Sequence, residues 1–364
     1  MYISMTPRLL TASVLSLGIG LSAFFQSIPA AHAGSSPLLY VPMGNEDNIA
    51  VVDTHDGKII RRIADVENIH GLARVPATGE LVAGSYSEYK DEPVKALPKP
   101  VGVSADEHAA HHAPKNQTRA KDGSYGLVSI IDPDQGTVTR RIEVAAPVHH
   151  MEVSPRSDFA VATHPDLGGV SIINLKNKKV MKTVLTGTMP NYSAFSKDGT
   201  RLYVSNAGDG TISEIDTERW IVRRNLIAGK GPEHMILGPD GRNIYVNNVE
   251  DGTVFEIDAK NGETRRSFSI GGEIHGIDLA DDGGTLYVAG MEKNVIAAID
   301  LKDGTMKTAS PGPEPYHLFT LKGTGMVYVS SAEDDTIWAL DGRTLKRTGQ
   351  IDLGGKGHQM VIGR

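Results

Sequence analysis

Histidine recurs with a nearly fixed period along this chain, and Tyr192 fills the one repeat position that lacks it. From His150 onward the steps are 42, 42, 41, 42 and 41 residues, and the first step of 80 holds one repeat plus an insertion of about 38. Repeats that close around an axis turn each repeated residue into a ring. Neutral imidazole is a ligand for Zn, Cu, Ni or Fe, so the pattern predicts a metal site. The recurring residues are His70, His150, His234, His275, His317 and His358.

A second set of histidines is expected at the same end of the repeats. The segment from Ser104 to Pro114 resembles a short capped helix, which would place His108 and His112 on one face with His111 beside them. His149 precedes His150, and His164 falls in a loop equivalent to the insertion. Eleven of the twelve histidines after residue 33 map to this end. We expect secondary, lid-borne metal ligands here, although a solvated polar loop is an equal alternative for the segment around His108.

Carboxylates precede four of the recurring histidines and are candidates to orient the imidazoles. They are Glu67, Glu233, Glu273 and Glu314. Polar loop residues are the alternative explanation for each of them.

One ion takes three or four imidazoles, so the six recurring histidines cannot all bind one ion. His70 and His275 also stand one residue earlier than the others relative to the following turn, which leaves open one ring or two tiers. A structural role for the histidines is a further alternative.

The repeat itself predicts short antiparallel strands. In the fifth repeat, four β-type runs separated by turn residues occupy 231–238, 243–248, 253–258 and 264–269. Four strands in about 42 residues is the size of a propeller blade. We predict an all-β, seven-bladed β-propeller over residues 34–364, with an insertion at 86–124 in blade 2. The run 38–43 reads as a second strand and the run 357–362 as a first, so the C-terminal strand would close blade 1.

Composition and the N-terminal segment limit the classes of function that the protein can have. Residues 1–33 have a positive start, an apolar run and an Ala31-His32-Ala33 cleavage site, which together predict a signal peptide and a periplasmic protein. The chain has no cysteine, which excludes thiolate ligands, disulfides and a lipoprotein anchor. Removing Arg8 takes the formal net charge from −7 to −8, which argues against nucleic-acid binding. No catalytic motif stands out, which favours a binding protein over an enzyme.

Several sequence motifs resemble a known family. Tyr203-Val-Ser-Asn206, Tyr245-Val-Asn-Asn248, Gly238-Pro-Asp-Gly241 and the Ile-Asp pairs are similar to the YVTN family of seven-bladed propellers, which is related to the haem d1 propeller of nitrite reductases. The outline is also similar to periplasmic propeller metallochaperones. The resemblance implies the fold; it does not choose among binding proteins, maturation factors and enzymes. In family members the recurring histidine position usually holds a small residue, so this chain departs from the pattern there.

These observations lead to one functional hypothesis and two alternatives. We expect a monomeric, exported propeller that binds Zn or Cu at a histidine-lined channel mouth under a His-bearing lid, and delivers the metal to a periplasmic metal-accepting protein. The first alternative is a protein that binds or matures a haem d1-type tetrapyrrole. The second is a protein-interaction scaffold without a cofactor.

Overall fold

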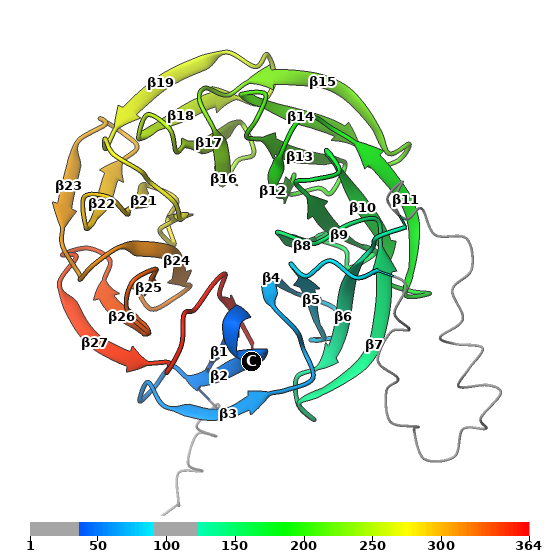
Figure 1. The fold of residues 1–364 in the computed structure, drawn as a ribbon. Helices are drawn as coiled ribbons and strands as arrows, with labels where there is room; N and C mark the ends of the chain where they lie inside the picture. Colours follow the sequence, from blue (N-terminus) through cyan, green and yellow to red (C-terminus); the bar gives the residue numbers. More distant parts are fainter. Residues whose placement is uncertain (1–35, 91–122, 364) are drawn as a thin grey trace, which may run out of the picture. The chain divides into compact units, whose positions relative to one another are not determined.

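The computed structural model describes residues 36–90 and 123–363. In these residues, 28 strands form seven four-stranded antiparallel sheets, and one short 3-10 helix, η1 (Gly44–Glu46), is present. The sheets stand around a central axis as the blades of a propeller (Figure 1). This confirms the predicted fold class. The predicted signal peptide at 1–33 and the histidines His108, His111 and His112 lie outside the described residues.

Each blade is numbered by its order around the ring, with its innermost strand first. Blade 1 is β28 (Val361–Ile362), β1 (Leu38–Met43), β2 (Asn48–Asp53) and β3 (Ile59–Ile63). Blade 2 is β4 (Ile69–Arg74), β5 (Leu81–Ser85), β6 (Gly126–Asp132) and β7 (Thr137–Val144). Blade 3 is β8 (Met151–Val153), β9 (Phe159–His164), β10 (Gly169–Asn174) and β11 (Lys179–Leu185).

The remaining four blades follow the same order without insertions. Blade 4 is β12 (Pro190–Phe195), β13 (Arg201–Asn206), β14 (Thr211–Asp216) and β15 (Ile221–Ile227). Blade 5 is β16 (Pro232–Leu237), β17 (Asn243–Asn248), β18 (Thr253–Asp258) and β19 (Thr264–Ser269). Blade 6 is β20 (Ile277–Leu279), β21 (Thr285–Gly290), β22 (Val295–Asp300) and β23 (Met306–Ala309). Blade 7 is β24 (Pro315–Leu321), β25 (Met326–Ser331), β26 (Thr336–Asp341) and β27 (Arg347–Asp352).

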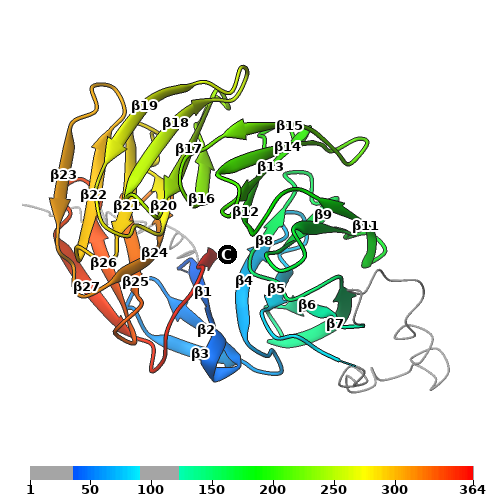
Figure 2. The same ribbon diagram turned by 45° about the horizontal axis from the view of Figure 1, so that its top comes forward.

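The predicted closure of blade 1 by the end of the chain is confirmed. Strand β28 pairs with β1 through Leu39↔Ile362 and Tyr40↔Val361, and the Gly363 N–H donates to the Leu38 carbonyl. Figure 2 shows the last strand beside β1 at the inner side of the ring. This pairing covers the edge of β1 that β2 leaves open, so β1 has a partner strand on both sides.

Seven apolar clusters hold neighbouring blades together, and each combines residues of two adjacent blades. Between blades 5 and 6, for example, Val254 and Phe268 pack with Ile277 and Leu286. The cluster between blades 7 and 1 includes Met360, which is 4% exposed. Burial of apolar side chains at every interface therefore stabilises the complete ring rather than any blade alone.

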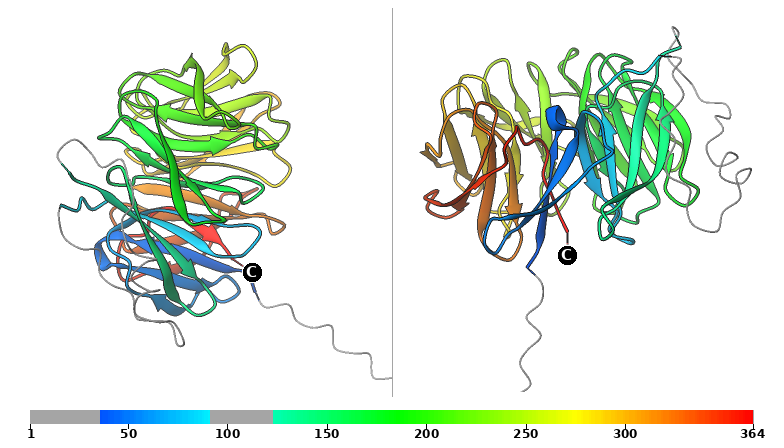
Figure 3. Two further views of the ribbon diagram at one scale, coloured as in Figure 1. Left: turned by 90° about the vertical axis from the view of Figure 1, so that its right-hand side faces the viewer. Right: turned by 60° about the horizontal axis from the view of Figure 1, so that its bottom comes forward.

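The aspartates that recur at the end of the third strand cap the turn that follows. Asp216 accepts hydrogen bonds from the backbone N–H groups of Glu218 and Arg219, and Asp258 accepts them from Lys260 and Asn261. This is the local bonding for which Asp is favoured in turns. The turns lie at the end of the ring opposite the recurring histidines. Side views in Figure 3 show the strands running between the two ends.

The insertion in blade 2 lies between β5 and β6. Its two described ends meet, because Tyr89 pairs with Tyr125 as an isolated β-bridge and their rings stack with centroids 5.6 Å apart. Among the described residues, none of the helical structure is long and apolar enough to cross a membrane.

Removing residues 357–364 should destabilise the whole ring. The deletion removes β28 and the buried Met360, and loss of a buried Met side chain alone typically costs about 2–5 kcal/mol. We expect a lower midpoint of urea unfolding and reduced solubility, because β1 is left with an open edge. Ile60→Ala in the same blade, at a side chain that is 53% exposed, is the control and should change stability little. An unchanged midpoint in the truncated protein would contradict closure by β28.

Candidate metal centre

The recurring histidines lie at the start of the innermost strands, where a β-bulge interrupts each of four blades. Register shifts occur between Ile69 and Gly71, and in the three segments 190–193, 232–235 and 315–318. In each case the inner strand has one residue more than its partner. A bulge breaks the alternation of side chains, so consecutive residues can serve the same face. The two sequence registers of the histidines therefore belong to one continuous group.

Buried polar side chains on the second strand of a blade fix the backbone at the histidine position. The hydroxyls of Thr163, Ser205 and Ser330 accept hydrogen bonds from the backbone N–H groups of His150, Tyr192 and His317, respectively. All three hydroxyl residues are fully buried. The Ser of the Tyr-Val-Ser motif thus satisfies an N–H that the bulge takes out of the ladder.

The rings form an aromatic belt around the channel mouth. We use the name histidine belt for His70, His149, His150, His234, His275, His317 and His358 together with Tyr192 and Tyr316. Neighbouring ring centroids are 4.4 Å apart at His70–His149 and His70–His358, 3.6 Å at His150–Tyr192, 4.7 Å at Tyr192–His234 and 6.1 Å at His317–His358. The belt therefore includes all six recurring histidines and the tyrosine that replaces the seventh.

Three members of the belt have the geometry of a metal site. One ligand atom from each of His234, His275 and His317 lies within 4.8 Å of the others. All three side chains are buried, and each has one buried ring nitrogen without a hydrogen-bond partner: Nδ1 of His234 and Nε2 of His275 and His317. Leaving a buried polar atom unpaired costs about 1–3 kcal/mol. A cation that accepts three nitrogen lone pairs would remove that cost.

Glu233 is the one predicted carboxylate that contacts this trio. Its Oε2 is 3.5 Å from Nδ1 of His275, so it orients the histidine of the next blade rather than its neighbour in sequence. Burial, and then the charge of Glu273, raise the pKa of Glu233 to about 7. Glu67, Glu273 and Glu314 are exposed, and none makes a recorded contact with an imidazole. The predicted carboxylate–imidazole pairing is therefore present at one position of four.

Burial keeps the imidazoles neutral. It lowers the pKa of His149, His234 and His358 to about 3, with neighbouring imidazoles as further causes. It also holds the pKa of His275 and His317 well below 6.5 for the same reasons. Neutral imidazole is the form that binds metals.

His70, His149 and His358 form a second group on the other side of the mouth. Nδ1 of His70 is 3.0 Å from the His149 carbonyl oxygen, and Nδ1 of His149 is 3.2 Å from that of Asn191. These bonds require Nδ1–H and leave each Nε2 with its lone pair. Nδ1 of His358 is buried without a partner. Among the described residues, the trio forms a three-ligand cluster and this second group does not.

His150 is engaged differently from its prediction as a metal ligand. Its ring stacks on Tyr192, its Nε2 lies 2.8 Å from the side-chain amide nitrogen of Gln359, and the Ser193 N–H donates to its Nδ1 at 3.4 Å. Gln359 follows His358 in the closing segment, so this contact spans the ring. Both nitrogens of His150 thus have partners within the protein.

His164 has a structural environment rather than the secondary metal role predicted for it. It is fully buried at the end of β9, with Nδ1 3.0 Å from the Pro147 carbonyl oxygen and Nε2 2.8 Å from the Ser171 hydroxyl. Neither nitrogen is left for a metal. Sequence spacing placed His164 at the correct end of the ring, but it could not show that neighbouring strands satisfy the imidazole.

Two tyrosines were missed by the sequence analysis. Tyr316 stacks on His275, with centroids 4.0 Å apart and planes at 13°, and Tyr86 lies 5.4 Å from His70. Tyr316 precedes His317 just as His149 precedes His150. That repeated pairing of ring residues was the available signal for a bulge with two inward side chains.

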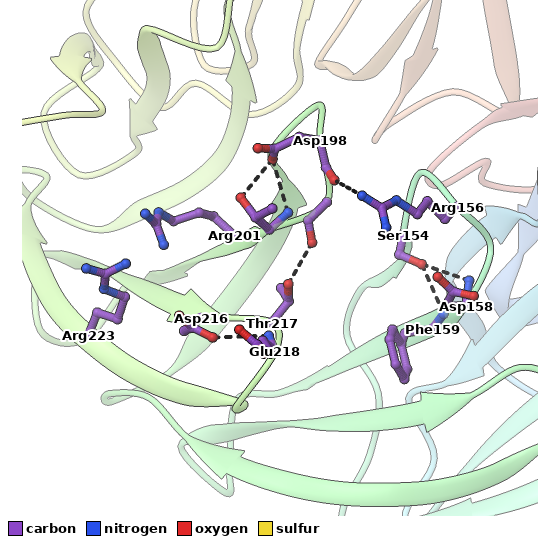
Figure 4. A pocket seen from close by; sticks show the side chains of 12 residues that line it. Ser154, Arg156, Asp158, Phe159, Asp198, Arg201, Asp216, Thr217, Glu218 and Arg223 are labelled. Carbon is purple, nitrogen blue, oxygen red and sulfur yellow. Dashed lines mark hydrogen bonds between the residues drawn. The ribbon is translucent and has the colours of Figure 1, made fainter.

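The blades 3 and 4 enclose a polar cavity of about 450 Å³ at the end opposite the histidines. Figure 4 shows Arg156, Arg201 and Arg223 around it with several carboxylates. Asp198 bonds to the turn residue Thr200, and Asp216 caps the next turn. Two of the carboxylates of this cavity, Asp198 and Asp216, therefore stabilise turns, and the candidate metal ligands lie at the other end of the ring.

The buried imidazoles predict a loss of stability in acid. For a histidine whose folded pKa is lowered, the unfolded state binds the proton first, so stability falls as pH drops below about 6.5 toward the folded value. Glu152 and Glu233, with raised pKa values of about 8 and 7, oppose this trend, as does Asp278. The buried histidines with lowered pKa outnumber these three carboxyl groups, so the net slope follows the histidines.

Urea unfolding of metal-free protein at pH 7.5, 6.5, 5.5 and 4.5 measures this slope. The free energy of unfolding should fall at each step below pH 6.5, and the fall should be shallower in a His234→Asn/His317→Asn variant. His55→Asn, at an exposed turn histidine, is the control and should keep the full slope. Stability that is constant or rises toward pH 4.5 would show that the belt is protonated in the folded state.

Comparison with known proteins agrees with the repeat analysis. Residues 178–346 match the model of the YNCE-like beta-propeller family. The "Uncharacterized protein YncE" of Salmonella typhi and that of Salmonella typhimurium are each 36% identical over 84 residues, which is 23% of this chain and 24% of each relative. The chain thus aligns with about a quarter of the length of these relatives.

Solved structures with the same fold include two proteins whose names state different activities. Periplasmic gluconolactonase PpgL of Pseudomonas aeruginosa has a TM-score of 0.69 at 16% identity, covering 90% of this chain and 99% of that one. Hydrazine synthase of Kuenenia stuttgartiensis has a TM-score of 0.67 at 13% identity, covering 87% and 98%. At these identities the likeness shows the fold alone. The chain is a seven-bladed β-propeller, and its residues 178–346 are similar to the YNCE-like beta-propeller family.

Proposed function

We propose that this protein binds a transition metal ion, Zn²⁺ or copper, through His234, His275 and His317. The observation that supports it is the set of three buried imidazoles that each offer one ring nitrogen within 4.8 Å of the others. Each of the three also has a buried ring nitrogen without a hydrogen-bond partner. Three imidazoles with an open fourth position are a ligand set that zinc uses in proteins. Nitrogen donors without thiolate suit Zn²⁺ and Cu²⁺ alike.

The role we propose is carriage and delivery of the metal in the periplasm. A site with three protein ligands leaves a position at which a donor or acceptor can add its own ligand before the protein ligands leave. The neighbouring group of His70, His149 and His358 extends the belt toward the rest of the mouth, with His358 centred 6.1 Å from His317. The predicted signal peptide supports export, and the acceptor would be a periplasmic metal-accepting protein.

Neither alternative function accounts for this geometry. The centroids of the trio lie 4.3 to 5.1 Å apart, so the rings pack against one another and leave no space between them for a tetrapyrrole. An interaction scaffold has no need of buried imidazoles with unpartnered nitrogens, which reduce stability unless a ligand binds them.

Substitution of the trio tests the proposal directly. Protein stripped with a chelator should bind one Zn²⁺ tightly, and His275→Ala or His317→Ala should weaken binding by more than about 100-fold, because even loss of an outer-sphere partner costs 10- to 100-fold. His55→Ala, at the exposed turn, is the control. The measurements are metal content by elemental analysis and affinity by competition with a chromophoric chelator. Wild-type affinity in both trio variants would refute the site.

The hydroxyl that fixes the blade 7 bulge provides an independent test. Ser330→Ala removes the acceptor of the His317 N–H and should cost about 1–3 kcal/mol of stability. It should also weaken Zn²⁺ binding, because His317 is no longer fixed. Ser205→Ala is the matched control: it removes the same bond in blade 4, where the bulge carries Tyr192. Equal Zn²⁺ affinities in the two variants would show that the bulge does not position the ligand.

A further inference from the structure

The loops at the histidine end of the ring are strongly acidic. These loops join the second strand of a blade to its third, and the fourth strand to the first strand of the next blade. Their exposed carboxylates in the described residues are Glu46, Asp47, Asp65, Glu67, Glu88, Asp166, Asp209, Glu250, Asp251, Glu273, Glu292, Glu314, Glu333, Asp334 and Asp335. The lysines in the same described loops are Lys90, Lys230, Lys293 and Lys356. We call these carboxylates the acidic collar.

The opposite end of the ring has a different charge pattern. Its turns carry many cations, and several of its aspartates are used as turn caps. The cations of these turns include Arg156, Lys176, Lys178, Lys197, Arg219, Arg242, Lys260, Lys302, Lys322, Arg343 and Lys346. Among the described residues, the opposite turns thus mix cations with carboxylates such as Asp56, Asp134, Glu218 and Glu263, whereas carboxylates far outnumber lysines at the histidine end.

Local contacts connect the acidic collar to the histidine belt. The Glu46 carboxylate lies against Gly355, three residues before His358, and Glu250 lies against Gly231, three residues before His234. Glu292 accepts a hydrogen bond from the backbone N–H of Glu273, two residues before His275. Carboxylates thus lie in the same loops that lead into the inner strands with His234, His275 and His358.

The collar supplies the long-range attraction that the trio lacks. Neutral imidazoles bind a metal at short range but exert little force on an ion in solution. Charges of one sign around a cleft raise the local concentration of the opposite ion and increase association rates by about 10- to 1,000-fold. The same field repels anions.

We propose that the acidic collar steers the metal to the histidine trio as a cationic species, the aqua ion or a cationic complex, and slows capture from anionic metal chelates. This inference rests on the proposed function, because the collar is proposed to bring the metal to the trio. It assigns the class of metal species that the protein accepts. It also requires that capture be sensitive to salt, because exposed charges are screened within about 8 Å at physiological ionic strength.

Stopped-flow capture of Zn²⁺ at ionic strengths from about 10 to 500 mM tests the proposal. In the wild type, the association rate constant for the aqua ion should fall at least about 10-fold across this range, with little change in the dissociation rate. The collar variant is Glu250→Gln/Glu333→Gln/Asp334→Asn/Asp335→Asn. It should be slower than the wild type at low salt and should lose most of the salt dependence.

A matched variant separates the collar from net charge. Asp56→Asn/Asp134→Asn/Glu218→Gln/Glu263→Gln removes the same charge from exposed residues at the opposite end and should retain the wild-type rate and salt dependence. When zinc is supplied as its anionic nitrilotriacetate complex, the effect of the collar on the capture rate should reverse. Capture should then be faster in the collar variant than in the wild type.

The outcomes distinguish this inference from the proposed function. Tight Zn²⁺ binding with an association rate that is insensitive to salt, or equally sensitive in both charge variants, would overturn the collar and leave the trio in place. Absence of Zn²⁺ binding by the wild type at equilibrium would refute the metal site of the trio. It would also refute the proposal that the collar steers a metal ion to this site. Salt-dependent capture that only the collar variant loses supports both.

Discussion

One hydrogen bond, from the backbone N–H at a β-bulge to a buried hydroxyl of the adjacent strand, underlies the arrangement of the channel mouth. A regular strand would direct alternate residues away from the axis. The bulge brings consecutive residues inward, and in blades 4 and 7 Ser205 and Ser330 remove the cost of the N–H that leaves the ladder. Thr163 makes the same bond to the His150 N–H in blade 3, so the hydroxyl fixes the inner strand at three places around the mouth.

The histidine belt places polar imidazoles at the centre of a ring that apolar contacts between the blades stabilise. Apolar clusters between the blades supply the cohesion of the ring, so the inner surface is free to carry polar groups. Some of the belt's nitrogens are satisfied by carbonyl or amide groups, as at His70 and His150. Each histidine of the trio, and also His358, has a buried ring nitrogen without a partner, and a buried unsatisfied polar group calls for a specific explanation.

The fold could be predicted from the sequence because it depends on a local pattern repeated seven times. Strand runs, Gly and Asp turns and the 42-residue period are all short-range signals, and ring closure followed from the phase of the two ends. The location of the histidines at one mouth could be predicted in the same way. Which of them are free to bind a ligand could not, because the deciding partners lie far along the chain. Gln359 engages His150 across 209 residues, and Glu233 serves His275 rather than His234.

The bulges were also beyond the sequence analysis. The sequence shows a shift of one residue at His70 and His275, which suggested two tiers, but the bulges lie in blades 2, 4, 5 and 7 and do not follow that shift. A one-residue insertion has no compositional signature in an inner strand, whereas the hydroxyl that accompanies it does occur at a fixed place in the Tyr-Val-Ser motif. The adjacent ring pairs His149–His150 and Tyr316–His317 were the second available sign.

The pairing of β1 with β28 has a consequence for the order in which the molecule can assemble. Leu39 and Ile362 come from opposite ends of the described fold, so the ladder that joins them carries a large loop-closure entropy and forms late. The belt residues of six blades, 2 to 7, can come together before that point, but His358 and Gln359 reach the mouth only with the closing segment. The mouth is therefore completed only in the last step of folding, when the two ends of the described fold pair.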